Sequence, residues 1–225
     1  MKRTVALCAL WLTLASAARA GQVTATCPID GERFVFDTPP ELSSHQTYLD
    51  QRPVDPAFPW PHPKCPASGF VIYKSAFSES EISRLRQYVP TDDYRTLSAA
   101  NTTHYLEAAL RRHLGDPPYE VAWALVQASW EAASDPDRYR RYAGEALAAY
   151  DSIPLNSLPE RRYRVLKQML SGELARRLGQ FDAARERFLR MRDSADLSHP
   201  FYQRIIDLQL ELIRKKDAGP HRIPY

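Results

Sequence analysis

Beyond residue 100, apolar positions recur with the period of an α-helix. In the segment 103–114, Leu106, Leu110 and Leu114 are spaced four residues apart, and a Gly-Asp-Pro-Pro sequence ends the pattern. Short connections would make consecutive helices antiparallel neighbours, so we predict a domain of helical hairpins over residues 101–225. The same period predicts five further helices, at residues 119–133, 137–153, 160–178, 181–192 and 201–216.

Residues 21–100 have shorter apolar runs and are rich in proline. The runs Phe34–Phe36 and Phe70–Tyr73 contain aromatic and β-branched residues, and each follows a Cys-Pro turn. This pattern predicts two short strands. Between them, residues 41–63 are polar and dense in proline, which predicts a surface loop with little regular structure.

One helix is also predicted within this first region. Residues 78–81 read Ser-Glu-Ser-Glu, a capping box, so a helix is expected to begin at Glu79 and to end near Val89, before Pro90. The predicted fold class is therefore mainly α. Helical hairpins follow a small β-rich module that occupies residues 21–100.

The N-terminus has the pattern of a signal peptide over residues 1–20. Lys2 and Arg3 form a short positive region, an apolar stretch follows, and Ala18-Arg-Ala20 places small residues at the two positions that a signal peptidase reads. We predict cleavage before Gly21 and export to the periplasm. No later apolar run approaches the ~18 to 20 residues of a membrane span, so no transmembrane helix is expected in the mature chain.

Charge argues against a nucleic-acid partner. The formal net charge of +3 comes from Lys2, Arg3 and Arg19, because residues 1–20 contain no acidic residue. The rest of the chain carries equal numbers of basic and acidic side chains. Nucleic-acid-binding domains usually have a basic excess, so we predict no nucleic-acid partner.

No motif of a known enzyme class stands out. The six histidines include no H-E-x-x-H pair, there is no G-x-S-x-G elbow, and no glycine-rich phosphate loop is present. His104 and His113 lie at the two ends of one predicted helix and are expected to be solvated or structural. We therefore predict a protein without catalytic residues or a cofactor.

The segment Leu170–Phe188 resembles one tetratricopeptide repeat. Gly172 occupies the small position where the two helices of such a repeat meet closely, and Gly179 occupies the turn. Ala184 and Phe188 fall on the inner face of the second helix. The resemblance implies stacked helical hairpins, and a plain helical bundle is the alternative.

Tetratricopeptide grooves hold extended or helical peptide segments, so the resemblance also implies a peptide-binding groove. Acidic or C-terminal carboxylate groups of a partner would suit its arginine side chains. The alternative for the arginine-rich hairpins is a solvated, salt-bridged surface. The candidate groove residues are Leu166, Met169, Glu173, Arg176 and Arg177.

The sequences Cys27-Pro-Ile-Asp-Gly and Cys65-Pro-Ala-Ser-Gly are two copies of C-P-x-x-G. They resemble paired zinc knuckles, C-P-x-C-G, in which Asp30 and Ser68 have replaced the second cysteine. With the downstream hairpins, they resemble a family of uncharacterised bacterial proteins that carry two such knuckles followed by tetratricopeptide-like hairpins. The resemblance implies a degenerate zinc-ribbon-like module and carries over no biochemical activity.

The two cysteines of these turns are expected to form a disulfide. One cysteine from each knuckle of a pair faces the other across the metal, and export supplies an oxidising compartment, so we predict a Cys27–Cys65 bond. Two alternatives remain open. Cys27, Asp30, Cys65 and a loop histidine, His45 or His62, would together offer ligands to a metal ion. The thiols would otherwise be free or redox-active.

These observations predict an exported, non-enzymatic scaffold or adaptor of the bacterial envelope. Its partner is expected to be another envelope protein or a peptide segment. The alternative function is a metal-binding protein or metal-dependent hydrolase that uses Cys27, Asp30, Cys65 and His62. A purely structural envelope component is the third possibility.

Overall fold

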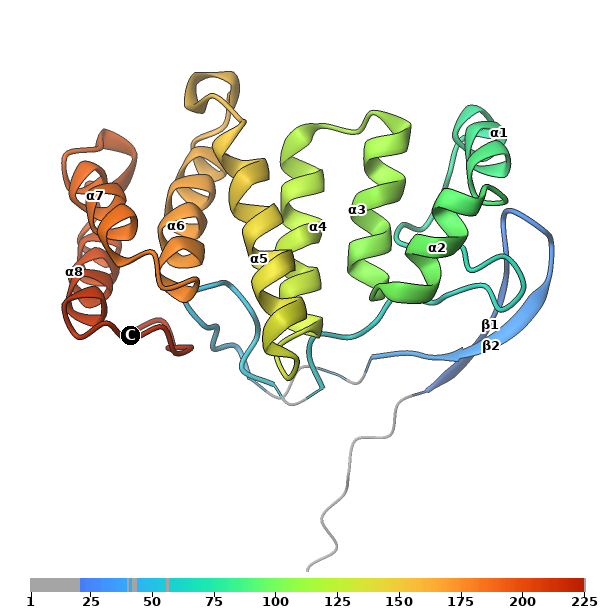
Figure 1. The fold of residues 1–225 in the computed structure, drawn as a ribbon, viewed down its shortest axis with the longest axis horizontal. Coiled ribbons are helices and arrows are strands. Elements are labelled where there is room, and N and C mark those ends of the chain that lie inside the picture. Colours follow the sequence, from blue (N-terminus) through green and yellow to red (C-terminus); the bar gives the residue numbers. More distant parts are fainter. Residues whose placement is uncertain (1–20, 40, 42–43, 56, 225) are drawn as a thin grey trace, which may run out of the picture.

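The computed structural model describes residues 21–39, 41, 44–55 and 57–224, so the predicted signal peptide lies outside the described residues. The fold is mainly α with a small β module, as predicted. Figure 1 shows the helices side by side in a row, with the β-hairpin at the α1–α2 end. The helices are α1 Glu79–Tyr88, α2 Asp92–Ala100, α3 Thr103–Leu114, α4 Pro118–Glu131, α5 Pro136–Asp151, α6 Arg161–Arg177, α7 Phe181–Arg192 and α8 Pro200–Arg214.

Local sequence signals set the helix ends. The Ser78 hydroxyl accepts a hydrogen bond from the Glu81 backbone N–H, and the Glu81 carboxylate accepts one from the Ser78 N–H at 2.7 Å, which forms the predicted capping box of α1. Gly115 ends α3 with a φ of 74°. Helix α2, which the Thr91 side chain caps, is not among the helices predicted from the sequence. The other helices lie close to their predicted bounds.

The β module is a single antiparallel hairpin of β1 Gln22–Thr26 and β2 Arg33–Asp37. The strand predicted at Phe34–Phe36 is confirmed within β2. The strand predicted at Phe70–Tyr73 is wrong, because Phe70 and Val71 are fully buried beside the cysteines and only Val71 makes an isolated bridge. The apolar run there reflects burial in a loop and not pairing in a sheet.

Two apolar cores meet on α3. Leu106, Leu110 and Leu114 pack with Cys27, Cys65, Phe70, Leu85 and Tyr94 in the smaller core. The opposite side of α3, which includes Tyr105 and Ala108, packs into the larger core formed with α4 to α8. The β module and the helical row therefore share one helix. Among the described residues, no helix combines the length and apolar character that a membrane span requires.

The helices α6 and α7 form a close hairpin, as the spacing of Leu170–Phe188 predicts. Gly179 makes the turn with a φ of 75°. Gly172 lies directly against the Phe188 ring, which is fully buried. A Cβ at Gly172 would stand 2.5 Å from Phe188 Cζ, so only glycine fits without a shift of the ring or helix.

Replacing Gly172 with alanine is expected to lower the free energy of unfolding by about 1 to 3 kcal/mol through overpacking. The matched control is Gly144→Ala in α5, where an added Cβ meets no atom within 4 Å. The control is expected to gain up to about 1 kcal/mol from helix propensity. Urea unfolding followed by circular dichroism measures both, and a stabilised Gly172→Ala variant would contradict the close hairpin.

A long loop links the C-terminal tail of the helical row to α3. We call residues 44–63 the strap; Pro56 within it is not described. The strap runs along the lower edge of the row in Figure 1. Leu49 donates its backbone N–H to the His221 carbonyl, and Ile223 donates to the Thr47 carbonyl. These bonds join the strap to the C-terminal tail, residues 216–224.

Candidate functional site

A groove of about 400 Å³ opens between α6, α8, the strap and the C-terminal tail. Its walls are mainly apolar, and Leu166, Phe201 and Tyr202 are only partly buried, so they are reachable from solvent. Helices α6 and α8 both start at the same end of this groove, because α7 reverses the chain between them (Figure 1). The lining residues are Thr47, Leu49, Gln51, Arg162, Val165, Leu166, Met169, Phe201, Tyr202, Ile205 and Ile223.

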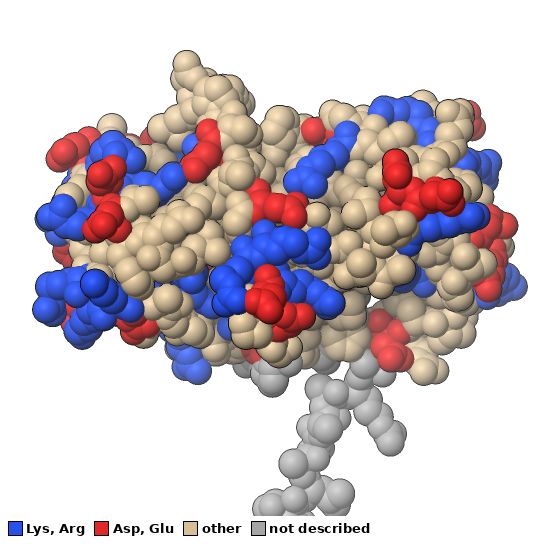
Figure 2. Space-filling view, viewed as in Figure 1, with Lys and Arg blue, Asp and Glu red and all other residues tan. Residues whose placement is uncertain are grey.

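Basic side chains stand at the end of the groove where these helices begin. Arg162 lines the groove and its side chain is 70% exposed. The guanidinium of Arg161 lies 5.6 Å from the centre of the Tyr202 ring. Both arginines have acidic neighbours, because Arg162 Nε lies 2.8 Å from the Glu160 carboxylate and Arg161 Nε lies 4.0 Å from the Asp196 carboxylate. Figure 2 shows that basic and acidic side chains are intermixed over one face of the molecule. The groove therefore combines an apolar floor with exposed, paired arginines at one end.

Two of the five predicted groove residues line this groove. Leu166 and Met169 are in its wall. Glu173 and Arg176 are not available to a partner, because they are 1% and 0% exposed, which corrects that part of the prediction. Arg177 lies between the strap and α5, with its guanidinium 3.5 Å from the Asp50 carboxylate and over the Tyr139 ring.

The Arg176 side chain is instead the centre of a buried polar network. It donates two hydrogen bonds to the Glu173 carboxylate through Nη2, at 2.7 and 2.8 Å, and one to Gln209 Oε1 on α8. It also donates to the backbone carbonyls of Asp217 and Gly219. Burial raises the pKa of Glu173 to about 7 against the attraction of Arg176. The network joins α6, α8 and the C-terminal tail.

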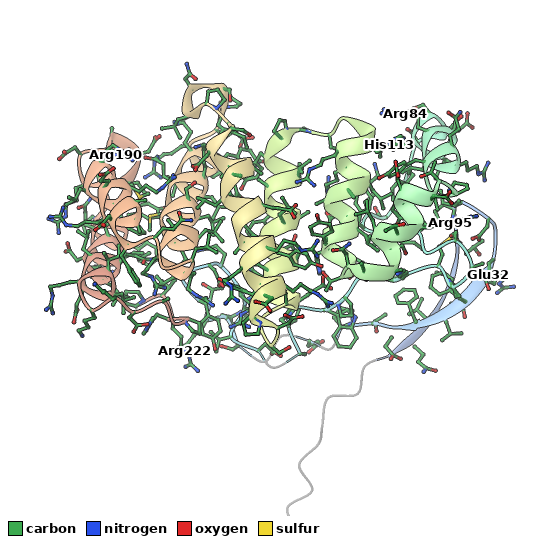
Figure 3. All side chains as sticks on the ribbon, viewed as in Figure 1. Glu32, Arg84, Arg95, His113, Arg190 and Arg222 are labelled. Carbon is green, nitrogen blue, oxygen red and sulfur yellow. A yellow bond between two sulfur atoms is a disulfide. The ribbon has the colours of Figure 1, made fainter. Side chains whose placement is uncertain are left out.

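The two Cys-Pro turns lie together, and Cys27 and Cys65 form the predicted disulfide, with Sγ atoms 2.19 Å apart. Ser68 Oγ lies 3.5 Å from Cys27 Sγ. The Glu32 carboxylate, labelled in Figure 3, accepts a hydrogen bond from the Ala67 N–H and so joins one turn to the other. The thiols are bonded to each other, so they are not available as metal ligands.

The alternative ligand set is therefore not assembled. The Asp30 carboxylate accepts a hydrogen bond from the Glu32 backbone N–H in its own turn. His62 lies at the other end of the strap from the tail contacts and bonds to Glu107, away from the disulfide. The alternative metal site of Cys27, Asp30, Cys65 and His62 is therefore wrong, because the two cysteines are bonded to each other and His62 contacts Glu107 instead. The position of His62 depends on a tertiary contact that the sequence does not show.

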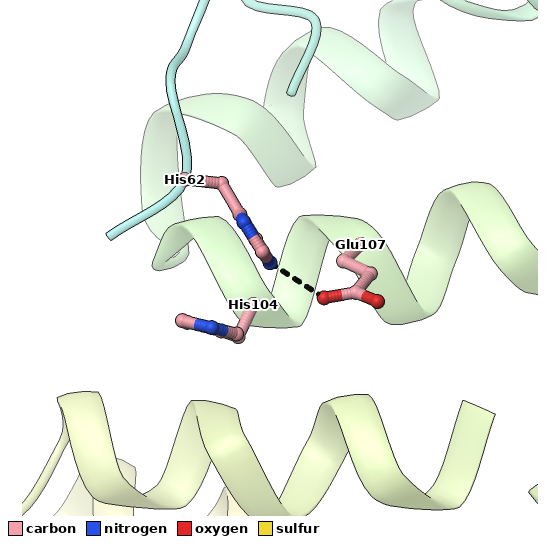
Figure 4. Close-up of side chains that lie close together, drawn as sticks. All are labelled: His62, His104 and Glu107. Atoms are coloured by element: carbon pink, nitrogen blue, oxygen red, sulfur yellow. Dashed lines mark hydrogen bonds and ion pairs between the residues drawn. The ribbon is translucent and has the colours of Figure 1, made fainter. Parts of the chain in front are cut away.

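His62 belongs to a different cluster, with His104 and Glu107 (Figure 4). His62 Nε2 lies 2.7 Å from Glu107 Oε2, and the two histidine rings are 4.2 Å apart between centres. The His62 backbone N–H donates to the Thr103 hydroxyl, which in turn donates to Glu131. The strap therefore reaches the N-terminal turn of α3 through both backbone and side chain.

A second set of side chains surrounds this cluster. His104 Nδ1 lies 3.1 Å from Glu131 Oε1, and Arg111 donates to Glu107 Oε1 at 2.7 Å. Burial disfavours the charged carboxylate, but hydrogen bonds and charge from His62 and Arg111 outweigh it and hold the pKa of Glu107 below its usual range. The pKa of Glu131 is lowered in the same way by His104. Both carboxylates are therefore ionised at neutral pH.

Sequence reasoning missed this cluster. His104 was expected to be solvated or structural, and the solvated alternative is wrong, since His104 is 4% exposed. One sequence signal was available: His104 and Glu107 have the i, i+3 spacing that places two side chains on the same face of a helix. The third member, His62, comes from the strap and carries no local signal.

Comparison of the chain with protein-family models, with curated proteins and with solved structures found no match. Functional inference therefore rests on the geometry of the groove and of the histidine cluster.

Proposed function

We propose that this chain is an exported, non-enzymatic interaction protein of the bacterial envelope. Its groove between α6 and α8 binds an extended peptide segment of another envelope protein, in which apolar side chains precede an acidic or C-terminal carboxylate group. The observation that carries the proposal is the groove itself, whose apolar floor ends at Arg162, a side chain that is 70% exposed and paired with Glu160.

The walls of the groove favour an apolar side chain as the anchor. Leu166, Phe201 and Tyr202 present apolar surface that is partly open to solvent. A volume of about 400 Å³ lies within the range of sites that hold small ligands or a few side chains. Aromatic and aliphatic pockets of this kind are where interfaces concentrate their binding energy.

The charged end favours a carboxylate beside that anchor. Arg161 and Arg162 are 51% and 70% exposed, so a peptide carboxylate would share their guanidinium groups with Asp196 and Glu160. The first N–H groups of α6 and α8 point toward the same end, where a helix dipole favours negative charge. Guanidinium groups bind carboxylates through paired hydrogen bonds. In this proposal Arg161 and Arg162 bind the carboxylate of the peptide, a role expected from the sequence for Arg176 and Arg177.

Export is part of the proposal. The pattern of residues 1–20 is typical of a signal peptide, and a disulfide between Cys27 and Cys65 suits an oxidising compartment. The resemblance of Leu170–Phe188 to a tetratricopeptide repeat also supports peptide binding, because repeats of that class commonly present concave binding surfaces.

Leu166→Asp is expected to weaken peptide binding by roughly tenfold or more, because it places a carboxylate in the apolar floor and repels the acidic end of the peptide. The matched control is Leu155→Asp, since Leu155 is exposed and lies outside the groove. Fluorescence anisotropy with short synthetic peptides measures the effect. The peptides carry leucine or phenylalanine before a free C-terminal glutamate.

Peptides that end in an amidated glutamine test the charge requirement. They are expected to bind more weakly than the acidic peptides to the unaltered protein. Equal binding of acidic and amidated peptides would show that the groove does not recognise a carboxylate group. If no peptide binds, or if both aspartate variants bind as the unaltered protein does, the groove is not a peptide site.

A further inference from the structure

Two histidines and a glutamate converge where the strap meets α3. His62, His104 and Glu107 each offer a ligand atom, and these atoms all lie within 4.8 Å of one another. His62 comes from the strap, whereas His104 and Glu107 lie three residues apart on α3, as Figure 4 shows. The three side chains therefore form a compact donor set from two separate parts of the chain.

The chemistry of this set is that of a transition-metal site. Two imidazoles and one carboxylate are the protein ligands of one common class of zinc site, in which the fourth position is open to water or another ligand. Imidazole donors favour zinc and its neighbours over magnesium or calcium, which prefer oxygen ligands. The observed contact of 2.7 Å between His62 Nε2 and Glu107 Oε2 holds two of these donor atoms together.

The surrounding side chains have the positions of outer-sphere partners. The Glu131 carboxylate lies 3.1 Å from His104 Nδ1, without a well-aligned hydrogen bond in this structure. Arg111 donates to the second oxygen of Glu107. In metal sites, a ligating histidine is oriented by a carboxylate that accepts a hydrogen bond from its other ring nitrogen, and a ligating carboxylate is oriented by a donor to its second oxygen. A small rotation of the His104 ring would align this bond.

Charge and access also suit a cation. Two buried carboxylates, Glu107 and Glu131, lie beside the rings. The guanidinium of Arg111 contacts Glu107 and is shared with Asp116 at 3.0 Å. The His62 side chain is 23% exposed, which leaves a path from solvent to the cluster. An ion bound there would replace the hydrogen bond between His62 and Glu107 with two stronger contacts.

We propose that His62, His104 and Glu107 bind one Zn²⁺ ion, which clamps the strap to α3. The inference goes beyond the peptide-binding function and stands without it, because its residues are not part of the groove. It also differs from the ligand set expected from the sequence, since no cysteine takes part. The bound ion would fix one end of the strap, whose other end lines the groove.

Zn²⁺ titration of tag-free, metal-stripped protein tests the site. One Zn²⁺ per chain is expected by native mass spectrometry. At a free concentration of about 100 times the Kd, Zn²⁺ is expected to raise the Tm by about 5 to 10 °C. Replacement by Co²⁺ should give the visible absorption of a nitrogen- and oxygen-bound ion.

His62→Gln is the decisive variant. A glutamine still donates a hydrogen bond to Glu107 but is a poor zinc ligand, so folding is retained while both the stoichiometric ion and the Tm shift are lost. The matched control is His221→Gln. His221 also pairs with a carboxylate, Asp217 at 2.9 Å, but it is not one of the three proposed zinc ligands. The control should bind Zn²⁺ as the unaltered protein does.

Two results would overturn the proposal. One is an unaltered protein whose Tm does not respond to Zn²⁺, and the other is a folded His62→Gln variant that binds the ion as tightly. Circular dichroism of each variant without metal shows that the fold is intact. Peptide binding is measured separately, so failure of the zinc site and failure of the groove give different results.

Discussion

Replacing Arg176 with methionine is expected to lower the free energy of unfolding by about 3 to 5 kcal/mol. The substitution leaves the buried Glu173 carboxyl without its counter-charge and with Gln209 Nε2 as its remaining donor. It also removes the donors to Gln209 Oε1 and to two carbonyls of the C-terminal tail. Breaking a buried ion pair from one side is costly because the remaining group has lost both water and its counter-charge. Urea unfolding followed by circular dichroism measures the loss.

Arg190→Met is the control for this variant. Arg190, labelled in Figure 3, is 69% exposed and lies 3.8 Å from the Glu186 carboxylate, so its loss is expected to cost about 0.5 kcal/mol or less. A double variant, Glu173→Leu with Arg176→Met, removes both charges and should lose less than the sum of the two single changes. A loss of under about 1 kcal/mol for Arg176→Met would contradict the buried network.

The second large effect is expected from the disulfide. Cys27→Ala with Cys65→Ala should lower the free energy of unfolding by roughly 4 kcal/mol, because the bond closes a loop with a sequence separation of 38 residues. Alanine is preferred to serine, since both cysteines are buried and a hydroxyl there would need a partner. Urea unfolding of the oxidised protein and of the variant measures the difference.

Reductant serves as the internal control. It should destabilise the unaltered protein by a similar amount and leave the double alanine variant unchanged. Labelling with a thiol reagent before and after reduction counts the bonded cysteines. An unaltered protein that labels fully without reductant would show that Cys27 and Cys65 are free.

Local signals predicted most of the helical fold. The capping box at Ser78, the glycine at Gly115 and the proline at Pro200 act within one or two turns of the chain, so they are visible in the sequence. The resemblance to a tetratricopeptide repeat implied that the two helices meet closely at Gly172, and the structure shows that Phe188 is the residue in contact there. The error at Phe70–Tyr73 arose because an apolar run looks the same in a strand and in a buried loop.

The candidate sites were less predictable, because both depend on the strap. Leu166 and Met169 were identified from their place in a repeat, whereas the strap residues of the groove, such as Leu49, have no local pattern. Arg176 was expected to face a partner, since nothing near it in sequence shows that α8 and the C-terminal tail cover it. The histidine cluster was missed because His62 and His104 are far apart along the chain.

By itself, the sequence determined the described helices other than α2 and their antiparallel order, because these depend on the hydrophobic period and on end signals. The resemblance of the two Cys-Pro turns to zinc knuckles led to the expectation that Cys27 pairs with Cys65, with a metal site and free thiols as alternatives. Only the tertiary structure decided which polar side chains are buried. Helix α8 and the C-terminal tail cover the last turn of α6, so Arg176 became a core residue. The strap brought His62 to α3, where it meets His104 and Glu107, residues that are far from it along the chain.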